Sequence, residues 1–154
     1  MNLLLWIGNE SNQKALANKL SKEFNIVGIV TESMPFKKKI TLKKVFDSLY
    51  EKIFLSEINK AWRGMKNYYE IEYSSYPNVK HIDVENINSE DAYNFSKNLN
   101  PDLIIVSGTR LVKKKMLSIS SEKGILNLHT GLSPYIKGGP NCTNWCIATK
   151  QFHL

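Results

Sequence analysis

The segment Gly124–Gly139, GILNLHTGLSPYIKGG, joins a short apolar run to a loop rich in glycine. The apolar residues fall within Ile125–Leu128, and this run predicts a buried strand. Asn127 and His129 are two positions apart, so in a strand their side chains point to the same side of the sheet. Open α/β sheets bind ligands beyond the carboxyl ends of their strands. The segment therefore predicts a functional site where this strand enters the loop Thr130–Gly139.

Strands and helices alternate along the rest of the chain. The predicted strands are Leu3–Ile7, Asn25–Thr31, Val79–Asp83 and Leu103–Val106, in addition to Ile125–Leu128. The predicted helices are Asn12–Lys22 with Ser11 as its cap, a helix to about Leu99 capped by Asn88 or Ser89, a short one near Val112–Ser118, and Asn141–Lys150. This order predicts an α/β fold, Rossmann-like, with a mostly parallel sheet flanked by helices. The loops Ser107–Arg110 and His129–Gly139 are expected to meet at one crevice.

Two features of the first half of the chain refine this picture. Gly8 is not part of a G-x-G-x-x-G pattern, so a dinucleotide site is unsupported. Residues 35–73 are too long for a simple β-α repeat, and their apolar spacing predicts an amphipathic helix or helix pair inserted into a single domain of residues 1–154. Trp62 is interpreted as a packing residue of this insertion rather than as a platform for a ligand. The insertion is expected either to shape a substrate pocket or to make a subunit contact.

Composition restricts the classes of function. The 154 residues carry a net charge of +7, and 42% of them are hydrophobic, which is typical of a globular protein. No apolar run is long enough to span a membrane, and Met1–Gly8 lacks the features of a signal peptide, so a cytoplasmic protein is expected. The spacing of Cys142 and Cys146 fits neither a disulfide framework nor a zinc site, and no metal is expected. Basic residues cluster at 37–44 and 110–115, either as solvated helix ends or as a surface that attracts phosphates or carboxylates.

The segment N-L-H-T-G-L-S-P-Y-I-K-G-G resembles the signature of the folate-dependent formyltransferases. That family includes methionyl-tRNA formyltransferase, glycinamide ribonucleotide formyltransferase and the sugar N-formyltransferases of polysaccharide biosynthesis. Pro101–Asp102, the apolar strand after it and Ser107–Gly108–Thr109 are similar to the segment that lines the pterin pocket of the family. The resemblance extends over most of the chain and is specific at Asn127–Gly138.

The resemblance implies a role for each matching residue. Asn127 and His129 correspond to two catalytic residues. Five residues would bind the cofactor, 10-formyltetrahydrofolate: Ser107, Gly108, Thr109, Arg110 and Leu111. Tyr135, Lys137 and Gly138 would contact the substrate. The chemistry agrees with these roles, because an amide N–H can donate to the oxyanion of a tetrahedral intermediate and an imidazole can donate to it or relay a proton.

The sequence departs from the family pattern in two places. Thr130 and Gly131 stand where the family commonly has Pro or Ala and then Ser, and Ser133 replaces a frequent Leu, which favours an outlying branch. The third catalytic residue of the family is an Asp beyond the His, and no acidic residue follows Glu122 here. We therefore expect a C-terminally truncated chain that lacks the last strands, binds folate weakly at best and transfers formyl groups poorly or not at all. Its last strand is expected to lie near an open sheet edge and to promote either self-association into a homo-oligomer or the binding of a partner.

Several acceptors fit the resemblance. The divergent loop and the helical insertion favour the amine of a nucleotide-linked amino sugar, a small-molecule substrate. The basic charge favours tRNA, which we rank second, and glycinamide ribonucleotide is third. A non-catalytic folate-binding fragment is the alternative from a different class, because the third catalytic residue is missing.

Overall fold

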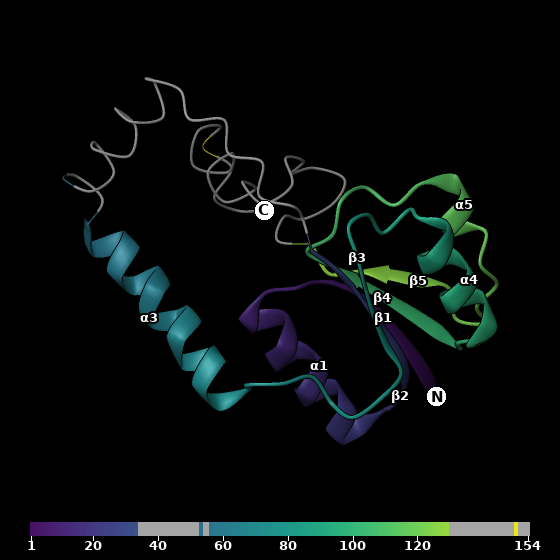
Figure 1. Ribbon diagram of the computed structural model, residues 1–154, viewed down its shortest axis with the longest axis horizontal. Coiled ribbons are helices and arrows are strands. Elements are labelled where there is room, and N and C mark those ends of the chain that lie inside the picture. The colour runs from purple at the N-terminus through teal and green to yellow at the C-terminus, as the bar shows by residue number, and fades with distance from the viewer. Residues whose placement is uncertain (34–52, 54–55, 130–149, 151–154) are drawn as a thin grey trace.

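The computed structural model describes residues 1–33, 53, 56–129 and 150. These residues form a parallel sheet with helices on both faces, which confirms the predicted α/β, Rossmann-like fold (Figure 1). The strands are β1 (Asn2–Gly8), β2 (Asn25–Glu32), β3 (His81–Val84), β4 (Leu103–Ser107) and β5 (Ile125–Asn127). The helices are α1 (Ser11–Glu23), α3 (Ser56–Glu72), α4 (Glu90–Asn98) and α5 (Lys114–Leu117).

The strand order is β3-β2-β1-β4-β5, and every pairing is parallel. The chain moves outward from β1 through β2 to β3, then returns to the other side of β1 as β4. The order of the strands therefore reverses between β1 and β4. In open parallel sheets, the carboxyl ends of the strands at such a reversal form the crevice in which ligands bind.

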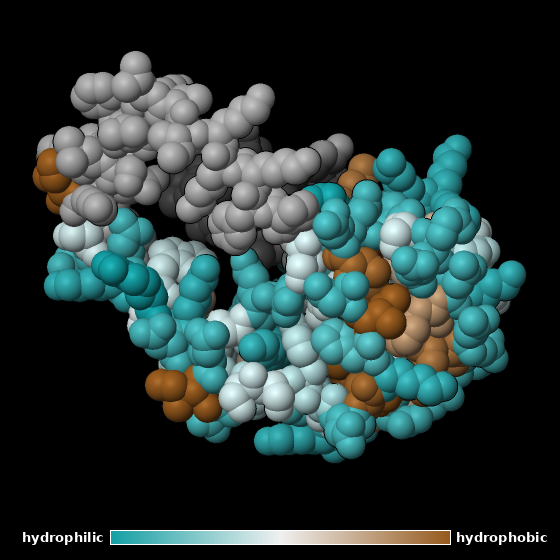
Figure 2. All heavy atoms as spheres, in the orientation of Figure 1, coloured by the Kyte–Doolittle hydropathy of each residue, from teal (hydrophilic) through white to brown (hydrophobic). Residues whose placement is uncertain are grey.

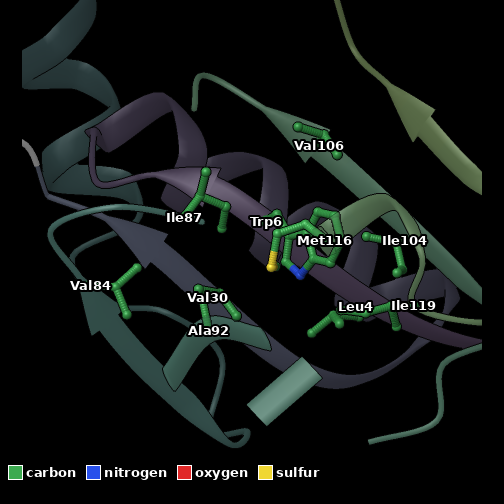
Figure 3. Close-up of a cluster of buried hydrophobic side chains, with 10 residues drawn as sticks. All are labelled: Leu4, Trp6, Val30, Val84, Ile87, Ala92, Ile104, Val106, Met116 and Ile119. Carbon is green, nitrogen blue, oxygen red and sulfur yellow. The ribbon is translucent and has the colours of Figure 1, made fainter. Parts of the chain in front are cut away.

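One face of the sheet is covered by α4 and α5. The side chains between them form an apolar cluster shown in Figure 3, made of Leu4, Trp6, Val30, Val84, Ile87, Ala92, Ile104, Val106, Met116 and Ile119. The indole Nε1 of Trp6 donates to Oγ of the fully buried Ser96 at 2.9 Å, so the polar atom of the largest core side chain is satisfied. Figure 2 shows a patch of hydrophobic residues on the surface near β4 and β5, whereas the surface around α5 is mostly hydrophilic.

The opposite face is covered by α1. Alternate residues of the central strands point to it and form a second cluster, made of Leu3, Leu5, Ile7, Ala17, Ile26, Ile29 and Ile105. Because a strand alternates its side chains between two faces, the continuous apolar run of β1 supplies both clusters. Helix α1 begins differently from the prediction. Glu10 is the N-cap residue, without a side-chain cap bond, and Ser11 is the first helical residue.

Helix α3 packs against α1 and extends away from the sheet (Figure 1). It confirms a helix in the second half of the predicted insertion, whereas most of residues 35–55 lies outside the described residues. The interpretation of Trp62 as a packing residue is wrong, since 57% of its surface is exposed. Tyr68, on the same helix, is also exposed. The reason is that α3 contacts the body of the protein mainly through α1, so most of its surface faces away from the core.

Strand β5 lies at one end of the sheet and pairs with β4. Ile125 packs against the cluster under α4 and α5, but Leu126 and Leu128 are 49% and 42% exposed. The expectation of a buried strand is therefore wrong for these two leucines, because their strand is at an edge of the described sheet. The other predicted strands are confirmed within two residues at each end, and Ser89 is confirmed as the cap of α4, its Oγ accepting from the N–H of Ala92.

Candidate functional site

Asn127 is the last residue of β5, and His129 follows two positions later. Both are exposed at the carboxyl end of the strand. The register pairs Asn127 with Val106 of β4, and the N–H of Leu128 donates to the carbonyl of Val106 at 2.8 Å. Paired residues of parallel strands point to the same face, and Val106 belongs to the cluster under α4 and α5. Asn127 is thus placed on the face of the sheet that carries these two helices.

The segment Ser107–Leu111 begins where β4 ends, one position beyond the partner of Asn127. Ser107 and Thr109 are partly buried, whereas Gly108 and Arg110 are exposed and Leu111 is 87% exposed. Gly108 has a φ of 69°, a conformation that glycine adopts without strain. Adjacent parallel strands therefore bring the predicted cofactor segment and Asn127 to the same edge of the sheet, as the sequence predicts.

The reversal of strand order lies beside this segment. The backbones of Gly8 and Gly108 approach so closely that a Cβ on Gly8 would lie 2.8 Å from the carbonyl oxygen of Gly108. The carboxamide of Gln13, from the first turn of α1, packs against Gly108. The Oε1 of Gln13 is buried and has no hydrogen-bond partner among the described residues. Glycine is needed at the end of β1 because the backbone of another loop occupies the place of a side chain.

Glu32, at the end of β2, connects two loops at the same edge. Its side chain is fully buried, and its Oε1 accepts from the N–H of Ile87 at 2.9 Å. Its Oε2 accepts from the N–H of Arg110 at 2.7 Å. The Nε of Arg110 lies 3.9 Å from Oε1, while the guanidinium side chain is 42% exposed. The carboxylate therefore ties the predicted cofactor segment to the loop that follows β3.

A polar network lies on the opposite face, at the ends of β1, β2 and β3. Asp83 accepts from the hydroxyls of Thr31 and Ser33, and Oγ of Ser33 accepts from Nδ2 of Asn9 at 2.8 Å. Because the hydroxyl hydrogen of Thr31 is directed to Asp83, its oxygen accepts from Nε2 of His81 at 3.0 Å.

Two groups beside this network have shifted pKa values. Burial lowers the pKa of His81, and the nearby charge of Asp83 partly opposes this shift. Burial, with a further contribution from Asp83, raises the pKa of Tyr76 to about 12. The ring of Tyr76 lies 5.0 Å from that of His81, and its hydroxyl donates to Oδ1 of Asn9 at 3.2 Å. Tyr76 therefore fastens the connection before β3 to the loop after β1.

Three predicted substrate contacts, Tyr135, Lys137 and Gly138, lie outside the described residues, as do Cys142 and Cys146. Within the described part of the chain, no group of three or more His, Cys, Asp or Glu residues is arranged to hold a metal ion. Among the same residues, no helix is long and apolar enough to cross a membrane.

Comparison with known proteins finds similarity at the level of structure. No protein-family model matches the sequence, and no curated protein matches it. A phosphoribosylglycinamide formyltransferase from Anaplasma phagocytophilum superposes with a TM-score of 0.56 at 15% identity, over 97% of this chain and 58% of the other. The protein has the fold of this formyltransferase.

Two further structures agree. Glycinamide ribonucleotide transformylase 1 from Symbiobacterium toebii gives a TM-score of 0.53 at 14% identity, over 97% of this chain and 60% of the other. A phosphoribosylglycinamide formyltransferase from Streptococcus pneumoniae gives 0.53 at 11% identity, over 97% and 67%. The chain thus spans roughly three fifths to two thirds of the length of these structures.

Sequence analysis did not identify Glu32 or the network around Asp83. For Glu32 a signal was present, because an acidic residue directly follows the apolar strand predicted at Asn25–Thr31. A charge at the end of a buried strand requires partners, and these come from the next loops along the sheet edge. Which loops supply them depends on strand order, which the pattern of apolar residues does not specify.

Proposed function

We propose that the protein binds 10-formyltetrahydrofolate and transfers its formyl group to a primary amine. The observation that carries the proposal is the position of Asn127 and His129, exposed at the end of β5 beside the strand that leads into Ser107–Leu111. The fold supports it, because three solved structures that resemble the chain are formyltransferases. The buried Oε1 of Gln13, which has no hydrogen-bond partner within the described part of the chain, adds an acceptor at the same edge of the sheet.

In the proposed reaction, the neutral amine attacks the formyl carbon of the folate. A tetrahedral intermediate forms, its oxygen becomes negative, and the bond from carbon to N10 then breaks to release tetrahydrofolate and the N-formyl product. The side-chain amide of Asn127 donates to the oxyanion, a contribution worth roughly 2.7–4 kcal/mol for one such donor. His129 donates to the same oxygen or relays the proton that the amine loses to N10, which then leaves as the neutral amine of tetrahydrofolate.

For the acceptor, we propose the amine of a nucleotide-linked amino sugar. The departures at Thr130, Gly131 and Ser133 and the long segment before β3 favour it over the purine-pathway substrate. Glycinamide ribonucleotide is the second candidate, favoured by the enzymes named in the similar structures. Both carry phosphate, which a chain with a net charge of +7 attracts. The same charge would support tRNA, whose binding would fall steeply with added salt.

The experiment has two parts, both carried out on the 154-residue chain. Thermal shift with 5-formyltetrahydrofolate measures folate binding, and mass spectrometry measures N-formyl products from the three acceptors with 10-formyltetrahydrofolate. Asn127→Ala should lower turnover by roughly 10²–10³-fold, whereas Asn94→Ala, an exposed residue of α4, should leave it unchanged.

The outcomes distinguish a formyltransferase from a non-catalytic folate-binding module. Folate binding with formyl transfer supports the proposal, and the preferred acceptor identifies the substrate. Folate binding without transfer to any amine would indicate the non-catalytic folate-binding module instead. Absence of any shift with the folate would reject both.

A further inference from the structure

The carboxylate of Glu32 is enclosed at the carboxyl edge of the sheet. Charged side chains are rarely fully buried unless they are paired, because removal from water is costly. Here each oxygen accepts one backbone N–H, from Ile87 and from Arg110, and the guanidinium of Arg110 lies nearby. A residue placed only to pack against its neighbours would not need this charge. Its position suggests that it holds the two loops in one arrangement.

Asn88 makes a second connection between the same loops. Its Oδ1 accepts from the N–H of Lys113 at 2.7 Å, and its Nδ2 donates to the carbonyl of Leu111 at 3.1 Å. Asn86 in turn orients Asn88, since its Oδ1 accepts from the backbone N–H of Asn88 at 2.9 Å. The amide side chain of Asn88 therefore binds one backbone carbonyl and one backbone N–H of the segment after β4, as the backbone of a neighbouring strand would.

Together these contacts fix the backbone of the segment at Arg110, Leu111 and Lys113, while its side chains stay outside. Leu111 is 87% exposed and Arg110 is exposed as well, so the segment presents an apolar group and a cation on a held backbone. Ile87, the other residue bound by Glu32, is fully buried in the apolar cluster of Figure 3. We call Glu32 and Asn88, with the backbone groups that they bind, the clamp. The clamp thus connects the surface segment Arg110–Lys113 to the buried core.

We propose that Glu32 and Asn88 are positioning residues that hold Arg110–Lys113 in the conformation that binds the folate. The proposal rests on the proposed function, because that function assigns folate binding to this segment. The planar pteridine would contact the exposed side chain of Leu111. Neither Glu32 nor Asn88 touches the ligand in this arrangement, and each acts through the backbone that it holds.

The test uses two variants and a matched control. Glu32→Gln keeps the shape of the side chain, but its NH₂ group then faces one of the two backbone N–H groups that Glu32 binds. Asn88→Ala removes the hydrogen bonds of that side chain to Leu111 and Lys113. Glu90→Gln is the control, because Glu90 of α4 forms an ion pair with Lys115 of α5 that links neighbouring segments but is exposed. Amide hydrogen exchange measured by NMR and the dissociation constant for 5-formyltetrahydrofolate are the two measurements.

Loss of a hydrogen bond that involves a charged or buried group corresponds to about tenfold or more in an equilibrium constant. We expect about tenfold faster exchange of the Arg110 amide in Glu32→Gln and of the Lys113 amide in Asn88→Ala, with a dissociation constant raised about tenfold in both. Glu90→Gln should change neither quantity. A lower melting temperature with an unchanged dissociation constant would show a merely structural role and overturn the proposal.

The outcomes also separate this proposal from the one on which it rests. If the unmodified chain does not bind 5-formyltetrahydrofolate, the proposed function fails and the role of the clamp in folate binding fails with it. If the unmodified chain binds the folate and both variants bind it equally well, only the clamp is overturned.

Discussion

The close contact between Gly8 and Gly108 leaves no room for a Cβ atom on Gly8, so this position requires glycine. A Cβ on Gly8 would meet a carbonyl oxygen of the backbone, which cannot rotate away as a flexible side chain can. The close approach joins the end of β1 to the start of the predicted cofactor segment. A methyl group at this position would therefore push the segment away from the sheet.

Gly8→Ala should accordingly lower the free energy of unfolding by about 1–3 kcal/mol, the usual cost of overpacking. Gly64→Ala is the matched control, because Gly64 lies within α3 and a Cβ there would have nothing within 4 Å. Alanine is the better helix former, so this change should stabilise the protein by roughly 0.5–1 kcal/mol. Urea denaturation of both variants measures the difference. A Gly8→Ala protein as stable as the unmodified chain would contradict the close contact.

At the scale of elements, the network around Asp83 ties the ends of β1, β2 and β3 together and makes stability depend on pH. The folded state lowers the pKa of His81 below its ordinary value of 6.5. The unfolded chain therefore binds more protons as the pH falls below 6.5, and the folded state loses stability relative to it. This contribution is fully present above pH 6.5 and is lost as the pH falls through the pKa of the folded state.

His81→Gln tests this dependence. Gln keeps an N–H that can donate to Thr31 but does not titrate, so the variant should lose less stability than the unmodified chain between neutral pH and a pH about one unit below the ordinary pKa of histidine. Urea denaturation at the two pH values gives the comparison, and the unmodified and variant proteins at neutral pH provide the reference. Equal losses in both proteins would show that His81 is not responsible.

The elements also show what the sequence predicts and what it leaves open. The strands were predictable because runs such as Leu3–Ile7 are apolar at every position, which is typical of strands buried on both faces. Asn127 was placed correctly at the end of a strand. The exposure of Trp62 was not predictable, since the spacing of apolar residues on α3 indicates an amphipathic helix but does not tell how much of its apolar face is covered.

The contacts of the clamp show a second limit of prediction from the sequence. Glu32 and Arg110 are far apart in the sequence, and their contact arises because β4 follows β1 in the sheet and the side chain of Glu32 reaches past the end of β1. Local pattern predicts that each strand exists, but the neighbours of each strand depend on tertiary packing. The contacts of Glu32 with the loops of other strands therefore escaped prediction, whereas the position of Asn127 beside the segment that follows β4 did not.

At the scale of the whole molecule, the sheet has β5 at one end, and among the described residues β5 pairs with β4 alone. Backbone groups at a sheet edge can pair with another chain, and exposed apolar side chains on such a strand strengthen the tendency. Leu126 and Leu128 supply these side chains. We therefore propose that the protein associates with a second copy of itself through β5, in line with the expectation from its sequence.

Light scattering across a concentration series tests this association. The apparent mass of the unmodified chain should rise with concentration, and Leu126→Lys should hold it at the mass of one chain, because a lysine on an edge strand must stay hydrated and so opposes pairing. Leu117→Lys is the control, since Leu117 is similarly exposed, at 52%, but belongs to α5 rather than to the sheet. A single-chain mass at every concentration would rule out association. Equal effects of the two lysine substitutions would show that β5 does not make the contact. Loss of association in Leu126→Lys alone would place it at the strand that carries Asn127, so that a second chain would lie beside the proposed site.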